Sequence, residues 1–184
     1  MPDKIVLAPF TGDISEILAF LKEQLADIFH LPIDEHPPLS LPQAYNSIRG
    51  QYFSRPFLER LLTIKEGNEF ILGITDKDLY TSGLNFIFGE AAIYAGVAVI
   101  ALARLHQNFY GLPEDKTLFK QRSLKEAVHE LGHLYGLDHC PDPHCVMHFS
   151  NSIEDTDVKS ASFCKNCRKK FGFLRKKLSE GWVY

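Results

Sequence analysis

Hydrophobic positions along the chain recur in two different patterns, and each pattern predicts a different kind of element. The short apolar run Ile5–Phe10 predicts a first strand. In residues 14–28 apolar side chains recur every three or four positions, which predicts an amphipathic helix. Glu69–Thr75 and Val97–Leu102 are almost continuously apolar, as expected of strands covered on both faces, and Leu84–Phe88 is a further strand candidate.

Two segments between these runs break the pattern. Leu31–Gln43 holds four prolines and predicts an exposed loop or an edge segment. It is too short to separate two cores. Tyr52–Leu62 can form a second helix.

The clearest helical pattern lies in Ser123–Tyr135. Its apolar stripe is Leu124, Ala127, Val128, Leu131 and Leu134, and Ser123 with Glu126 has the spacing of a capping box. After Gly136 the chain becomes irregular and rich in cysteine, histidine and proline, and a short basic helix is expected at Lys165–Leu178. Strands that first alternate with helices and then cluster predict a mixed α/β sheet packed by helices.

Length and charge narrow the class of protein. A chain of 184 residues predicts one domain, and a net charge of −3 gives no reason to expect nucleic acid as its main partner. The N-terminal apolar run is too short for a signal peptide, and the uncharged stretch between Glu90 and Arg104 is too short to span a membrane. We therefore expect a soluble, cytoplasmic, monomeric protein that does not bind membranes. In such a reducing compartment the four cysteines are not expected to form disulfides.

A histidine-rich motif carries the chemistry. His129 and His133 stand four residues apart on the predicted helix, so they face the same way and can share one metal ion. Glu130 lies beside that ion without binding it, which suits a general base that takes a proton from metal-bound water. Gly136 permits the helix to end and the chain to turn back, so that His139 can become the third ligand. Three histidines leave a fourth position open, as a catalytic zinc requires.

These residues resemble the zinc-binding motif of the metzincin metallopeptidases, H-E-x-x-H-x-x-G-x-x-H followed by a methionine turn. Met147 stands in that turn, and the positions of the four cysteines are similar to those of one branch, the archaemetzincins. The resemblance is close from Leu124 to Cys167 and looser in Ile71–Asp76 and Asn85–Glu90. It implies that Met147 forms a hydrophobic floor beneath the catalytic metal without binding it.

The resemblance also implies an overall architecture. We expect a single metzincin-like α/β (α+β) domain over residues 1–184, with a twisted, mostly parallel sheet and an antiparallel edge strand. Its parts would be an upper sheet and helix part (1–122), the zinc-binding helix and turn (123–139), and a cysteine-rich methionine-turn region with the C-terminal helix (140–184). A peptide substrate would lie extended along an edge strand, here Leu84–Glu90.

The four cysteines fall into two close pairs. Cys140 and Cys145 have four residues between them, and Cys164 and Cys167 have two, which are spacings typical of a structural zinc site. A site of four cysteines has no open position, so its role is in folding. His144 or His148 could replace one cysteine as a ligand, or could fill the open position at the catalytic metal.

The sequence therefore predicts a zinc metallopeptidase that holds two zinc ions, one catalytic and one structural, and that cleaves a peptide or protein substrate. Aminopeptidase and short-peptide endopeptidase action are both open. The alternative is a zinc-stabilised binding protein for peptide or nucleic acid with a silent or blocked site. Asp138 is a candidate hydrogen-bond acceptor for a ligand histidine. The lysine and arginine side chains of the predicted last helix are interpreted as a solvent-exposed face of that helix.

Overall fold

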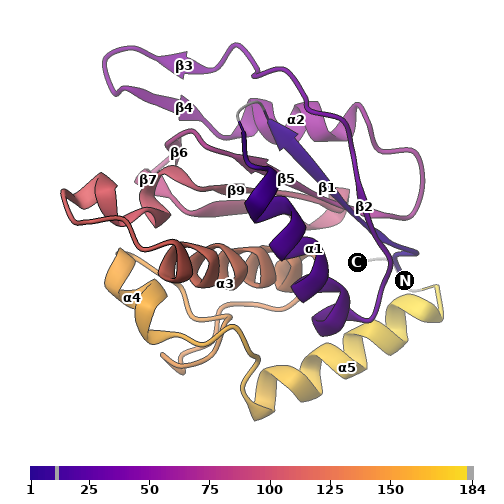
Figure 1. Ribbon diagram of the computed structural model, residues 1–184. Helices are drawn as coiled ribbons and strands as arrows, with labels where there is room; N and C mark the ends of the chain where they lie inside the picture. The colour runs from indigo at the N-terminus through magenta and orange to yellow at the C-terminus, as the bar shows by residue number, and fades with distance from the viewer. Residues whose placement is uncertain (11–12, 182–184) are drawn as a thin grey trace.

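Five strands form the main sheet of the computed structural model, which describes residues 1–10 and 13–181. Their order is β2-β1-β5-β9-β8 (Figure 1), with bounds β1 Ile5–Phe10, β2 Ile33–Glu35, β5 Phe70–Thr75, β8 Gly89–Ala92 and β9 Val97–Ala101. All neighbours pair in parallel except β8, which runs antiparallel to β9 at one edge. The predicted mixed α/β sheet, mostly parallel with an antiparallel edge strand, is confirmed.

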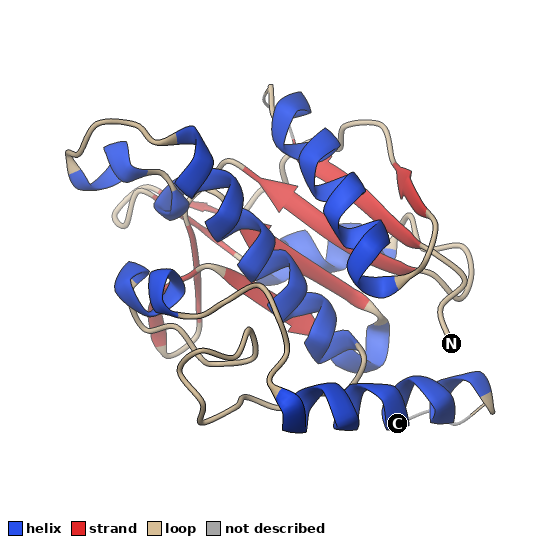
Figure 2. Cartoon of the chain, turned by 60° about the horizontal axis from the view of Figure 1, so that its bottom comes forward, coloured by secondary structure: helices blue, strands red, loops and turns tan. Residues whose placement is uncertain are grey.

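Both faces of the central strands are buried, and successive side chains enter different cores. Phe70, Leu72 and Ile74 of β5 point into a large hydrophobic cluster, whereas Ile71 points into a smaller one on the opposite face. Figure 2 shows two long helices on the same face of the sheet, α1 (Ser15–Phe29) and α3 (Lys116–Leu134). The other face is covered by α2 (Arg55–Leu62). This two-sided burial is why the strands read as continuous apolar runs.

A second, smaller sheet was not predicted. Its order is β3-β4-β6-β7, and the strands are β3 Tyr45–Asn46, β4 Gln51–Phe53, β6 Leu79–Thr81 and β7 Leu84–Ile87. Because Tyr52 belongs to β4, the helix expected from Tyr52 begins only at Arg55. The strand expected at Leu84–Phe88 ends at Ile87, and the chain then crosses into the main sheet as β8.

The longest helix begins earlier than the sequence predicted, and the predicted capping box is wrong. Asp115 caps α3 by accepting a hydrogen bond from the Leu118 amide at 2.9 Å. Ser123 lies inside the helix, where its hydroxyl donates to the Phe119 carbonyl at 2.8 Å. Glu126 turns inward and is buried, so neither residue marks a helix start.

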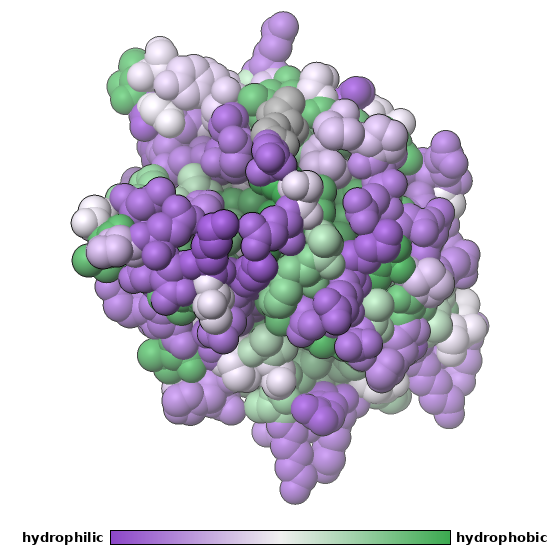
Figure 3. Space-filling model, in the orientation of Figure 1, coloured by the Kyte–Doolittle hydropathy of each residue, from purple (hydrophilic) through white to green (hydrophobic). Residues whose placement is uncertain are grey.

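The remaining elements are short, apart from the last helix. They are the 3-10 helices η1 Ile93–Ala95, η2 Ala103–Leu105 and η3 Gln107–Tyr110, and the helices α4 Ile153–Val158 and α5 Lys165–Ser179. The last helix agrees with the prediction, and Phe171 anchors it to the large core. The face of the molecule in Figure 3 is largely hydrophilic, with apolar side chains showing between polar ones. Among the helices of residues 1–10 and 13–181, none combines the length and the hydrophobicity that a membrane span needs.

Candidate metal centre

Two histidines on α3 meet through their ring nitrogens. The Nε2 atoms of His129 and His133 lie 3.1 Å apart. Each ring is held from behind, because the Nδ1 of His129 donates to the Val146 carbonyl at 2.8 Å and the Nδ1 of His133 donates to the Leu137 carbonyl at 2.7 Å. With the proton fixed on Nδ1, both Nε2 lone pairs are available to a metal.

Asp138, a candidate acceptor for a ligand histidine, therefore orients neither of the two α3 histidines. Its side chain is 84% exposed and pairs with Lys170 at 2.5 Å. The orienting acceptors are backbone carbonyls, which a reading of side-chain types does not identify.

Gly136 ends the helix as predicted. Its φ is +87°, a left-handed conformation that residues with a Cβ rarely adopt. The Gly136 amide bonds the His133 carbonyl at 2.8 Å, and the Leu137 amide bonds the Gly132 carbonyl at 3.1 Å, which together form a Schellman motif. The turn brings His139 back, so that ligand atoms of His129, His133 and His139 all lie within 4.8 Å of one another. We call these three residues the histidine group.

The spacing of the histidine group fits zinc. Tetrahedral zinc with Zn–N bonds of about 2.05 Å separates two ligand nitrogens by roughly 3.3 Å, close to the 3.1 Å between His129 and His133. Burial lowers the pKa of all three histidines from the ordinary value of 6.5, most strongly at His129. They are therefore neutral near pH 7, as metal ligands must be.

Glu130 lies fully buried beside the histidine group. Burial raises its pKa well above 4.5, and the nearby Glu126 carboxylate raises it further, whereas Lys159 lowers it. Strand β8 comes very close, since a Cβ added to Gly89 would lie 2.5 Å from Oε1 of Glu130. The absence of a side chain at Gly89 therefore leaves the room that Glu130 occupies.

A cavity of about 430 Å³ opens over these residues between α3 and the segment that forms β7 and β8. Its floor carries the histidine group and Glu130, and its walls are mainly apolar. The wall residues include Phe86, Ile87, Phe88, Ile93 and Phe149. The ring of Phe149 lies 4.9 Å from that of His139. The site can therefore enclose an extended molecule of peptide size beside the candidate metal position.

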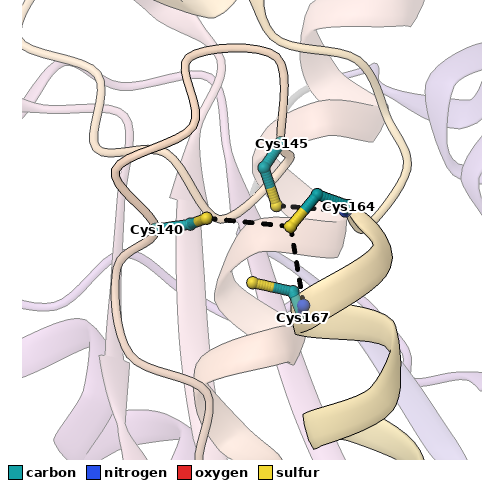
Figure 4. A group of neighbouring side chains, drawn as sticks. All are labelled: Cys140, Cys145, Cys164 and Cys167. Carbon is teal, nitrogen blue, oxygen red and sulfur yellow. Dashed lines mark hydrogen bonds between the residues drawn. The ribbon is translucent and has the colours of Figure 1, made fainter.

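The four cysteines converge as predicted. Figure 4 shows the side chains of Cys140, Cys145, Cys164 and Cys167 pointing toward one another, two from the loop after the motif and two from the start of α5. Their sulfurs lie within 4.8 Å of one another, and we call them the cysteine group. Cys140 Sγ and Cys164 Sγ are 3.8 Å apart, the separation expected for a tetrahedral site with Zn–S bonds of about 2.3 Å. The amide of Cys167, at the N-terminus of α5, lowers the pKa of Cys164 to about 7.

His144 and His148 belong to neither group. The Nδ1 of His148 donates to the Cys140 carbonyl at 2.9 Å, and His144 is exposed. Met147 is fully buried against α3, where a Cβ on Gly132 would overlap its sulfur. Its carbonyl accepts a hydrogen bond from the Cys140 amide at 2.9 Å, so the methionine turn is joined directly to the segment that carries His139.

Two charged residues near the site were missed by the sequence analysis. Lys159 is fully buried and forms an ion pair with Glu126 at 3.0 Å. The Thr156 hydroxyl donates to the same Glu126 oxygen at 2.9 Å. Glu126 stands one helical turn before Glu130, a spacing that could have indicated a second carboxylate near the site. Nothing in the sequence places Lys159 there, because 32 residues lie between it and Glu126.

Comparison with known proteins gives a consistent result. The model of peptidase family M54 matches residues 38–172. An archaemetzincin of Pyrococcus furiosus is 46% identical, and the match covers 100% of this chain and 98% of that protein. The crystal structure of archaemetzincin from Methanopyrus kandleri has a TM-score of 0.85 at 38% identity, covering 95% of this chain and 96% of the other. A zinc-dependent peptidase from Methanocorpusculum labreanum has a TM-score of 0.84 at 28% identity, covering 91% of this chain and 99% of the other.

Proposed function

Because the chain belongs to peptidase family M54, the archaemetzincins, which are zinc metallopeptidases, we propose that it hydrolyses peptide bonds in the cavity above the histidine group. The observation that carries the proposal is the pair of Nε2 atoms 3.1 Å apart with the Glu130 carboxylate buried beside them. His129, His133 and His139 would hold the catalytic zinc, and Glu130 would act as the general base.

Zinc bound by the histidine group would polarise the scissile carbonyl and acidify water. Glu130 takes the proton from the attacking water and later gives it to the departing amine. Its burial supports this role, because burial raises the pKa of the carboxyl group and so makes the carboxylate a stronger base toward water. The carbonyls of Val146 and Leu137 keep the two α3 histidines oriented while the proton moves.

The free edge of β8 offers a place for the substrate backbone. The Ala101 amide donates to the Phe88 carbonyl at 2.8 Å. In an antiparallel pair every second residue bonds the neighbouring strand, so from Phe88 onward alternate residues direct their N–H and C=O groups toward β9. Gly89 and Ala91 therefore direct theirs outward, away from the sheet. We infer that an extended peptide pairs with these two residues by strand addition, because Gly89 lies beside the Glu130 carboxylate. The predicted substrate strand, Leu84–Glu90, is divided between the two sheets. Its first part is β7, which belongs to the smaller sheet, and only its end belongs to β8.

The cysteine group would hold a second zinc with no open position. It closes the chain between the loop that follows His139 and the start of α5, so we assign it a structural role. Its sulfur spacing supports this assignment, and the total is then two zinc ions per chain.

The test pairs zinc content with peptide turnover. Glu130→Gln should keep both zinc ions and its melting temperature, but should lose hydrolysis by roughly 10²–10⁴-fold, since general-base assistance contributes about that much. His133→Ala should lose one zinc ion together with activity. Glu59→Gln is the matched control, because Glu59 is exposed and pairs with Arg55 away from the cavity.

A broad peptide library serves as the substrate. Turnover by Glu130→Gln at the wild-type rate would exclude Glu130 as the base. A zinc-loaded wild-type protein that cleaves no peptide but binds some would favour the alternative, a silent zinc-stabilised binding protein.

A further inference from the structure

The cavity has an uneven distribution of charge. Its described lining includes three carboxylates, on Glu90, Glu126 and Glu130, and no lysine or arginine side chain. Glu126 is already neutralised by Lys159 at 3.0 Å, and Glu130 is assigned to the chemistry. Among the described residues no side-chain cation lies within ion-pair distance of Glu90, so this carboxylate has no role in the sites described above.

The hydrogen bonds of Glu90 are incomplete. Oε1 accepts one hydrogen bond, from the Thr81 hydroxyl at 3.3 Å. Oε2 is shielded from solvent and has no donor within the described part of the chain. A shielded carboxylate oxygen without a donor has lost its hydration without compensation, which is unfavourable. The terminal torsion of a glutamate is soft, so the carboxylate can turn toward a donor that enters the cavity.

The position of Glu90 defines which part of a substrate would supply that donor. Glu90 and Glu130 line the same cavity, and Glu90 directly follows Gly89, the position in β8 that faces the Glu130 carboxylate. A cationic group placed at Glu90 would donate to Oε2, complete its hydrogen bonds and neutralise its charge.

We propose that Glu90 binds a primary ammonium group of the substrate close to the bond that is cut, and so selects substrates that carry this charge. The inference rests on the proposed function for the location of the scissile bond. An ammonium group can come from the free amino terminus of a peptide or from a lysine side chain. The first source makes the protein an aminopeptidase, and the second gives a preference for lysine.

Binding to a protein that does not cleave gives the test. The full chain with Glu130→Gln, loaded with zinc, is titrated calorimetrically with three probes. L-leucinamide carries only the α-ammonium, N-acetyl-L-lysinamide carries only the side-chain ammonium, and N-acetyl-L-leucinamide carries neither. At least one charged probe should bind about ten- to a hundredfold more tightly than the uncharged one, as expected for a charge-assisted hydrogen bond. The probe that does so identifies the source.

Adding Glu90→Gln should abolish this preference, whereas Glu90→Asp should retain part of it. The glutamine can still accept the hydrogen bond from Thr81, so the melting temperature should not change, and Glu59→Gln should not alter binding. Equal affinities for all three probes, absence of binding by either charged probe, or a preference that survives Glu90→Gln would overturn the proposal. Charged probes that bind through Glu90 in a protein whose wild type cleaves no peptide would refute the proposed function and leave standing only the assignment of Glu90 as an ammonium-binding residue.

Discussion

Replacing Lys159 by Met should destabilise the protein more than any surface change of charge. Lys159 is 0% exposed and its partner Glu126 is 3% exposed, so the substitution leaves a carboxylate buried without a counter-charge. Breaking a buried pair on one side costs about 3–5 kcal/mol. For a protein of this size, 1 kcal/mol shifts the melting temperature by roughly 2–4 °C, so the expected decrease is about 6–20 °C.

The assay is thermal and urea unfolding at a fixed zinc concentration, with a double-mutant cycle. Glu126→Gln retains an acceptor for the Thr156 hydroxyl, and the double variant Lys159→Met/Glu126→Gln removes both charges together. The double variant should be more stable than Lys159→Met alone. Lys116→Met is the control, because Lys116 is 74% exposed and lies 3.5 Å from Glu16, a pair expected to contribute less than about 1 kcal/mol. A melting temperature of Lys159→Met equal to that of the wild type would contradict this prediction. So would simple additivity of the two changes in the free energy of unfolding.

The other predictions concern the two metal groups and the packing between them. Cys164→Ser should lower the melting temperature and increase hydrogen exchange after Gly136, and equal melting curves would exclude a structural role for the cysteine group. A mild chelator should remove zinc from the open histidine group first, so that metal analysis falls from two ions to one while circular dichroism stays unchanged. In the metal-free protein the unfolded chain takes up protons on the three histidines near pH 6.5, before the folded chain does, because burial lowers their folded-state pKa. The free energy of unfolding measured in urea should therefore fall as the pH drops below about 6.5, and a flat profile would contradict this. Gly132→Ala should displace Met147 and weaken zinc binding at the histidine group, measured by competition with a chelator.

The parts of the site that were predicted correctly depend on local geometry. The spacing of His129 and His133 follows from the pitch of a helix, and the turn at Gly136 follows from a conformation that glycine adopts readily. The convergence of four cysteines was likewise expected from their spacing in two short segments. None of these inferences requires knowledge of how distant elements pack.

The parts that were missed depend on packing between distant segments. The Lys159–Glu126 pair joins α3 to the end of α4, and a sequence gives no register for that contact. Asp138 was a candidate acceptor for a ligand histidine, but two backbone carbonyls orient the α3 histidines, and every residue has a carbonyl. The strands of the smaller sheet are two to four residues long, too short for a periodic pattern to appear.

The close approach of β8 to Glu130 has a consequence for the study of sequence diversity. A protein can keep all three histidines and the glutamate and still be disabled if the residue at the position of Gly89 acquires a side chain, because that side chain would compete with the carboxylate for the same space. Such a protein would pass a motif search as an enzyme while being a pseudoenzyme. The residue one place before Glu90 is therefore a marker to inspect, together with the zinc-binding motif, when genomes are surveyed for active relatives.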